Sequence, residues 1–224
     1  MLAEKEKNKL TGKSNEEATY LASDYFADWK DPLVIEYAKN VTPKNASPIE
    51  IAVSLYYAIR DDFRYNPFTI YDNKKKYKAS EFLQRQEGHC IDKANLLIAC
   101  CRLNGIPARY RFANVRNHVG TEKLEAILKT DILVYHGMAE LFIDNQWVKA
   151  TPAFNKELCE KLNVVPLEFN GKEHSIFQEY DRSDNAFMEY LHDYGSFHEF
   201  PFEQFISTFF EYYPHLRGSE YILS

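Results

Sequence analysis

Residues 88–109 read GHCIDKANLLIACCRLNGIPAR. The segment 90–104 is strongly apolar and holds neither glycine nor proline, whereas glycines flank it on both sides and a proline follows. The flanking glycines and the proline predict a helix that begins at Cys90. Apolar residues occupy most of its circumference and leave only a narrow polar stripe. We therefore expect a central helix with neighbours on most of its faces.

Cys90 stands in the first turn of this helix. The free amide groups and the dipole of a helix N-terminus favour a negative charge, so a thiol there is expected to lose its proton easily, with a pKa in the roughly 3.5–7.5 range of activated thiols. Asp92 competes for the same dipole and would raise the thiol pKa, while Lys93 would lower it. The sequence does not show which of these two effects on the thiol pKa is larger. It predicts that Cys90 is the reactive cysteine and that Cys100 and Cys101 are buried.

Composition, net charge and the distribution of apolar residues exclude several classes of protein. The chain has 224 residues, of which 45% are hydrophobic and 15% aromatic, and this suffices for a folded globule. A net charge of -6 argues against a dedicated nucleic-acid binder. The first residues lack the apolar core of a signal peptide, and no apolar run approaches the roughly 20 residues of a membrane span. We expect a cytoplasmic protein without a membrane partner.

The four cysteines lie at positions 90, 100, 101 and 159. They form no disulfide framework, and the sequence holds neither a CxxC pair nor an HExxH motif. We therefore expect no metal and no organic cofactor. A metal site built from Cys90 and His136 is an alternative that metal analysis of the purified protein would test.

Helical and strand patterns alternate along the rest of the chain. A serine, a proline and an acidic first turn predict a helix start at 47–50, running to about residue 63. Alternation of apolar and polar residues predicts a strand at 109–113 and a hairpin of 135–143 with 147–150. We expect one domain, 1–224, with a core at about 45–155, an N-terminal helical segment and a C-terminal extension at 156–224. Further helices are predicted at 121–129, 184–194 and 202–213.

A helix N-terminal cysteine followed by a histidine on a hairpin strand is the arrangement that a Cys–His nucleophile requires. The imidazole takes the thiol proton, and a third group fixes the tautomer of the ring. His136 opens the hairpin and is the candidate base. His89 adjoins the cysteine, but neighbouring residues on a helix diverge, so His136 is preferred.

Four motifs of the chain, taken together, resemble those of a known family. GHCIDKA at 88–94 continues into RLNGIPAR at 102–109, and HGMAE at 136–140 and WVKATP at 147–152 follow. Over about residues 50–155 the chain resembles the transglutaminase-like superfamily. The resemblance implies an α+β, papain-like core in which the helix that carries the nucleophile packs on an antiparallel sheet. It also implies that Cys90 is the nucleophile and His136 the base.

The chain departs from the family pattern at two positions. Thr151 stands where the family has its aspartate, and Met138 replaces the usual tryptophan. A threonine hydroxyl can accept a hydrogen bond from the imidazole, but it cannot stabilise an imidazolium by charge. Thr151 is the first candidate for the orienting residue, and Asn155 and Glu140 are alternatives.

An oxyanion hole would draw on the backbone amide of Cys90, with Tyr65 or Gln84 as side-chain partners. These residues predict a cysteine enzyme that acts on amide or peptide bonds through a thioester. Hydrolysis, deamidation and transamidation share that intermediate, and hydrolysis is favoured because water is always present. The expected partner is a peptide or protein amide. The alternative is a catalytically weak or inactive module of the same family that binds peptide or protein.

Overall fold

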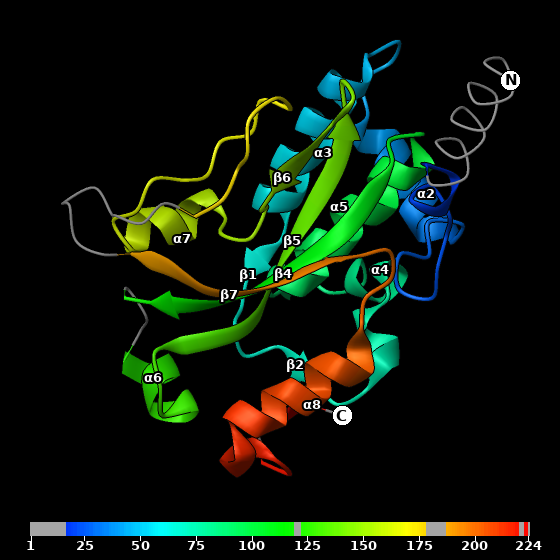
Figure 1. Ribbon diagram of the computed structural model, residues 1–224. Helices are drawn as coiled ribbons and strands as arrows, with labels where there is room; N and C mark the ends of the chain where they lie inside the picture. The colour runs from blue at the N-terminus through cyan, green and yellow to red at the C-terminus, as the bar shows by residue number, and fades with distance from the viewer. Residues whose placement is uncertain (1–16, 119–121, 178–186, 220–221, 224) are drawn as a thin grey trace, which may run out of the picture.

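The computed structural model describes residues 17–118, 122–177, 187–219 and 222–223. Its fold is α+β: a four-stranded antiparallel sheet packs against helix α5 (Cys90–Leu103). The helices α2 (Pro32–Val41) and α3 (Pro48–Asp62) lie on the side of α5 away from the sheet (Figure 1). This is the arrangement that the resemblance implies.

Helix α5 is the centre of the molecule, as the sequence predicts. Every residue from Cys90 to Arg102 is buried. The polar residues of the helix are therefore also inside, and each needs a partner. Asn95 shows how this is achieved: its amide donates to the carbonyls of Phe26 at 3.0 Å and Tyr77 at 2.8 Å.

Lys93 anchors the first turn of α5. Its ammonium group donates to the carbonyl oxygens of Arg60, Phe63 and Ala153, each at 2.8 Å. Burial lowers the pKa of Lys93 to about 7. These three bonds tie the turn that carries Cys90 to the end of α3 and to the chain that follows the hairpin.

The sheet has the order β6-β5-β4-β7, with every neighbouring pair antiparallel. The strands β5 (Ile132–Ile143) and β6 (Gln146–Ala150) form the predicted hairpin, and β4 (Ala108–Asn117) contains the predicted strand. A single core cluster of buried side chains extends from Phe26 to Leu216. That the whole chain is one domain stays a prediction.

The prediction of a helix at 184–194 is wrong over its described part. Residues from 188 onward form strand β7 (Met188–Phe197), and residues 184–186 lie outside the described ranges. β7 pairs with the edge of β4 that β5 leaves free. Its tyrosines suit a strand, and the backbone groups of β4 need partners, so the distant pairing outweighs the local helical pattern.

Local capping explains the other helices. At α3, the Ser47 hydroxyl and the Glu50 carboxylate cap each other's backbone amides, which confirms the predicted start. α6 (Glu122–Leu128) and α8 (Phe202–Tyr212) also occupy predicted positions. No helix among the described residues combines the length and apolarity needed to cross a bilayer. The remaining elements are β1 (Arg64–Tyr65), β2 (Ile70–Tyr71), η1 (Lys74–Tyr77), α4 (Ala79–Phe82), β3 (Glu87–Gly88), α7 (Lys156–Lys161), η2 (Pro214–Leu216) and β8 (Ile222–Leu223).

Candidate active site

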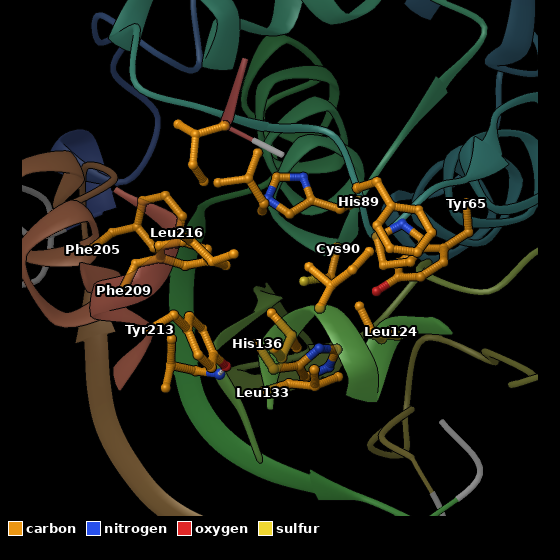
Figure 2. Close-up of a pocket in the computed structure, with 17 residues that line it drawn as sticks. Tyr65, His89, Cys90, Leu124, Leu133, His136, Phe205, Phe209, Tyr213 and Leu216 are labelled. Atoms are coloured by element: carbon orange, nitrogen blue, oxygen red, sulfur yellow. Dashed lines mark hydrogen bonds between the residues drawn. The ribbon is translucent and has the colours of Figure 1, made fainter. Parts of the chain in front are cut away.

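A pocket opens at the N-terminus of α5. Cys90 lines it together with His89 and His136, and Figure 2 shows the cysteine side chain between the two imidazole rings. The three side chains are nearly enclosed, with 8%, 4% and 4% of their residue surfaces exposed. The other walls come from β1, β2, α6, β5, α8, η2, β8 and the residues that adjoin them, and they are mainly apolar. Their residues are Tyr65, Pro67, Phe68, Ile70, Leu124, Ile127, Leu128, Leu133, Val134, Phe205, Phe209, Tyr213, Leu216 and Ile222.

Gly137 brings β5 against the start of α5. Its backbone amide donates to Sγ of Cys90 at 3.4 Å. A Cβ atom at this position would lie 3.1 Å from Cα and from Cγ1 of Ile91, closer than packed side chains normally allow. A side chain at this position would therefore press on Ile91, and glycine lets the strand approach the start of α5 without that contact.

The direction of His136 is set by a bulge. The register of β4 against β5 shifts between Ala113 and Val115, and Tyr135 adopts a left-handed φ of 53°. A bulky residue in that conformation costs about 1–3 kcal/mol and must be held by its surroundings. Tyr135 is held by a hydrogen bond from its amide to Oδ1 of Asn114 at 3.1 Å and by stacking on Tyr194. The bulge turns the next residue, His136, into the pocket.

The thiol of Cys90 is not acidic in this closed pocket. Burial raises its pKa to about 11, and the negative charge of Asp92 acts in the same direction. The amides of Gly137, Ile91 and Cys90 itself lower the pKa, but by less. The expectation of a depressed pKa is therefore wrong for the unliganded molecule, because loss of water around the sulfur outweighs the helix N-terminus.

His136 is a neutral imidazole. Burial lowers its pKa to about 4, and the electrostatic effect of the His89 imidazole acts in the same direction. Among the described residues, neither Nε2 of His136 nor Oγ1 of Thr151 has a hydrogen-bond partner. The hydrogen bond between them that the family pattern suggests is not formed in this structure. The backbone carbonyl of Thr151 accepts from the hydroxyl of Tyr56 at 3.1 Å.

The alternative orienting residues have other partners. Oδ1 of Asn155 accepts the backbone amide of Tyr65 at 3.1 Å. Glu140 accepts from Nε of Arg109 at 2.6 Å and from Nη1 of Arg111 at 3.1 Å. The carboxamide of Asn155 and the carboxylate of Glu140 therefore form structural hydrogen bonds with residues other than His136.

His89 has the carboxylate partner that His136 lacks. Its Nδ1 lies 2.6 Å from Oδ2 of Asp92, and its backbone amide donates to the same oxygen at 3.0 Å. Arg85 donates to the other oxygen of Asp92 at 2.8 Å. Although adjacent residues on a helix diverge, His89 lines the same pocket as Cys90, because it is the N-cap residue with an extended backbone, φ −101° and ψ −172°. The signal in the sequence was the spacing of His89 and Asp92, which places a side-chain acceptor three residues after the cap.

The oxyanion candidates differ in position. Tyr65 lines the pocket, and burial raises the pKa of its hydroxyl. Gln84 instead donates its side-chain amide to the carbonyl of Ser80 at 3.2 Å. In the described part of the chain, no group of three or more His, Cys, Asp or Glu side chains is placed to hold a metal ion.

This arrangement can perform acyl transfer. A buried sulfur lies next to a backbone amide and between two imidazoles, in a pocket that shields it from water. Nucleophilic attack by the sulfur on a carbonyl needs a proton acceptor, a proton donor for the leaving group and a donor for the oxyanion. The pocket supplies candidates for all three.

Comparison with known proteins places this site in a family. A model of the transglutaminase-like superfamily matches residues 35–152. No curated protein matches the chain. Among solved structures it is similar to a "putative cysteine protease" from Cytophaga hutchinsonii, with 17% identity and a TM-score of 0.47 over 81% of this chain and 54% of that one. It is also similar to a "putative protease" from Parabacteroides distasonis, with 16% identity and a TM-score of 0.37 over 60% of this chain and 26% of that one.

The chain thus spans about half the length of the Cytophaga protein. The family model covers more than half of this chain and includes both Cys90 and His136. The protein belongs to the transglutaminase-like superfamily.

Proposed function

We propose that the protein is a cysteine enzyme that cleaves amide or peptide bonds through a thioester on Cys90. The observation that carries the proposal is the pocket that Cys90, at the start of α5, lines together with His136, where the amide of Gly137 donates to the sulfur. His136 takes the thiol proton. Thr151 is proposed as the residue that positions His136 during turnover, since its hydroxyl has no other partner among the described residues, whereas Asn155 and Glu140 are already hydrogen-bonded elsewhere.

The reaction has two halves. Sγ attacks the carbonyl carbon, the C–N bond breaks, and the amine leaves while the acyl group stays on sulfur. Water then attacks the thioester, and the acid leaves as the sulfur regains its proton. The tetrahedral oxyanion of each half can be stabilised by the backbone amide of Cys90 and the hydroxyl of Tyr65. Because water is the acceptor that every site has, we favour hydrolysis over transamidation.

The walls of the pocket indicate the acyl group. The side chains that line it include no Asp, Glu, Lys or Arg within the described ranges. Phe205 and Phe209 of α8 and Leu216 of η2 form one apolar wall. A charged group would lose its water here without gaining a partner, whereas an apolar one gains about 25 cal/mol per Å² buried. We infer a peptide or protein amide whose acyl residue has an aromatic or aliphatic side chain.

The direct test is detection of the thioester. Incubation with a p-nitrophenyl ester of N-acetylphenylalanine, followed by peptide mapping by mass spectrometry, should place the acyl group on Cys90. Cys90→Ala should abolish the adduct, while Cys159→Ala, which changes a buried cysteine outside the pocket, should keep it. Absence of an adduct on the wild-type Cys90 would contradict the proposal.

A noncatalytic peptide-binding module is the second candidate. The observation in its favour is Thr151 in the place of the family's aspartate, with the ring of His136 left without a carboxylate. In that case Cys90→Ala would bind apolar peptides as tightly as the wild type, and neither protein would release products.

We propose a cytoplasmic location without a nucleic-acid partner. Cys90, Cys100, Cys101 and Cys159 are thiols rather than disulfide partners in this structure, which suits a reducing compartment. The net charge of -6 opposes binding to phosphate backbones. Fractionation of the source cells would test the location directly.

A further inference from the structure

The pocket contains a second imidazole that the family pattern does not use. His89 is 4% exposed, and its Nδ1 is fixed by Oδ2 of Asp92 at 2.6 Å. Its Nε2 is buried and has no hydrogen-bond partner among the described residues. The ring lines the same pocket as Cys90. An oriented imidazole with one free nitrogen in a reactive pocket is equipped to move a proton at that nitrogen.

The carboxylate distinguishes the two rings. A hydrogen-bonded carboxylate favours the positively charged form of an imidazole and holds the proton of Nδ1 in place. Asp92 provides this for His89, and it is itself held by Arg85. Within the described ranges Nε2 of His136 has no such contact, and burial keeps the pKa of His136 low.

We propose that His89 is a second catalytic residue, the proton donor to the leaving amine and the proton acceptor from the hydrolytic water, and that Asp92 positions it. This division of labour rests on the proposed function. His89 and His136 lie on opposite sides of Cys90 (Figure 2), so each can serve a different face of the reacting carbonyl.

The proton transfers balance over one catalytic cycle. On acylation, His136 takes the thiol proton as the S–C bond forms, and protonated His89 gives its Nε2 proton to the nitrogen as the C–N bond breaks. On deacylation, neutral His89 takes a proton from water as the new C–O bond forms, and His136 returns its proton to the sulfur as the C–S bond breaks. Both rings then regain their starting states, and the net reaction is amide plus water to acid plus amine.

Groups from several elements surround the ring of His89. The groups that face it are Asp92 from its own helix, the ring of Tyr77 from η1 at 5.8 Å, and His136 from β5. Tyr65 from β1 and Tyr213, which follows α8, also line the pocket. The carboxylate of Asp92 is the anion in direct contact with the ring, so it is the group that holds Nδ1 in a fixed orientation.

The leaving group provides the test. Nitrophenolate leaves without a proton, whereas an alkylamine needs one, so loss of the donor should affect only the amide. We expect His89→Gln to acylate with the p-nitrophenyl ester of N-acetylphenylalanine within about threefold of the wild-type rate. Cleavage of the matching N-methylamide should fall by about 10²-fold or more. Hydrolysis of the thioester should slow as well, so that acylated Cys90 accumulates in mass spectra.

The control substitution is His118→Gln. His118 lies outside the pocket, with its side chain 34% exposed near Glu189, and this variant should keep all three rates. Asp92→Asn should reproduce the loss on the amide more weakly and shift the pH profile of deacylation. If Asp92→Asn fails to fold, since Asp92 also caps α5, the result for His89→Gln decides.

The outcomes separate the two proposals. Equal losses of ester acylation, amide cleavage and Cys90 alkylation in His89→Gln would show a structural role and overturn the proton-transfer role. Unchanged amide cleavage and deacylation would also overturn it. If the wild-type protein forms no thioester on Cys90, the proposed function itself fails.

Discussion

The backbone amide of Gly137 points at Sγ of Cys90 from 3.4 Å. Because Gly137 directly follows His136, one short segment of β5 supplies a hydrogen-bond donor to the sulfur and, under the proposed function, its proton acceptor as well. The amide stabilises a thiolate once it forms, while burial resists its formation. The reactivity of Cys90 therefore depends on proton transfer within the pocket more than on a resting thiolate.

Alkylation should be selective for Cys90 and should increase with pH. Burial raises the pKa of Cys90 to about 11, so the thiolate fraction grows as pH rises toward that value. Burial raises the pKa of Cys100 and Cys101 further, and they do not line the pocket. Iodoacetamide labelling from pH 6 to 10, with mass-spectrometric assignment, should show Cys90 modified first at every pH. Equal labelling of Cys159 would contradict this.

His136→Ala should change the shape of the alkylation profile. At neutral pH the wild-type thiol reacts with His136 as its proton acceptor, so the variant should react about tenfold more slowly or worse. Near pH 10.5 a free thiolate needs no acceptor, and the two rates should converge. His118→Ala serves as the control. Profiles that stay parallel over the whole range would remove His136 from the proposed pair.

His136 should also make stability depend on pH. Its pKa is about 4 in the folded protein against 6.5 in the unfolded chain, so the unfolded state binds more protons between these values. The free energy of unfolding should therefore fall as pH drops from 7 to 4, by up to about 3 kcal/mol from this group. Urea titrations of wild type and His136→Leu at pH 4 and 7 measure the difference. A gap between the two proteins that does not change with pH would refute the assignment.

Thr151 can be tested by removing its hydroxyl. Thr151→Val should lower amide cleavage severalfold if the hydroxyl orients His136 during turnover. It should leave the free energy of unfolding unchanged or slightly higher, because no described residue hydrogen-bonds to this hydroxyl in the resting structure. Thr69→Val is the matched control. Its hydroxyl donates to the carbonyl of Asn66 at 2.9 Å, so this change should cost about 1 kcal/mol without altering cleavage.

Thr151→Asp extends that test. A carboxylate beside His136 should raise the pKa of the imidazole, which NMR titration of the ring would detect. If neither substitution changes the kinetics, Thr151 has no orienting role and His136 works without a third member.

The apolar wall should control which acyl groups are accepted. Phe209→Ala removes an aromatic ring from the pocket, so KM for N-acetylphenylalanine substrates should rise about tenfold, while turnover of an acetyl ester should change little. Phe210→Ala is the matched control. Phe210, like Phe209, has 5% of its surface exposed, but it does not line the pocket. Equal effects of the two substitutions on KM would indicate a loss of packing only.

The sequence predicts those features that depend on local order. The start of α5, the cap of α3 and the β5–β6 hairpin each follow from a few neighbouring residues. β7 was missed because its strand state comes from pairing with β4, far away in the chain. The pKa of Cys90 could not be foreseen, since it depends on how much water the surrounding elements exclude. The spacing of His89 and Asp92 signals the cap, but the direction of the His89 ring also depends on the extended backbone angles of that one residue.

The position of β4 between β5 and β7 has a consequence for synthesis of the protein. β5 follows β4 closely, but β7 ends only at Phe197, so one edge of β4 stays open until that late segment has left the ribosome. At about 5–20 residues per second this delay lasts for seconds. An open strand edge is a template for pairing with other chains. The nascent chain therefore passes through an aggregation-prone stage, in which chaperone protection of β4 would matter more than at any later time.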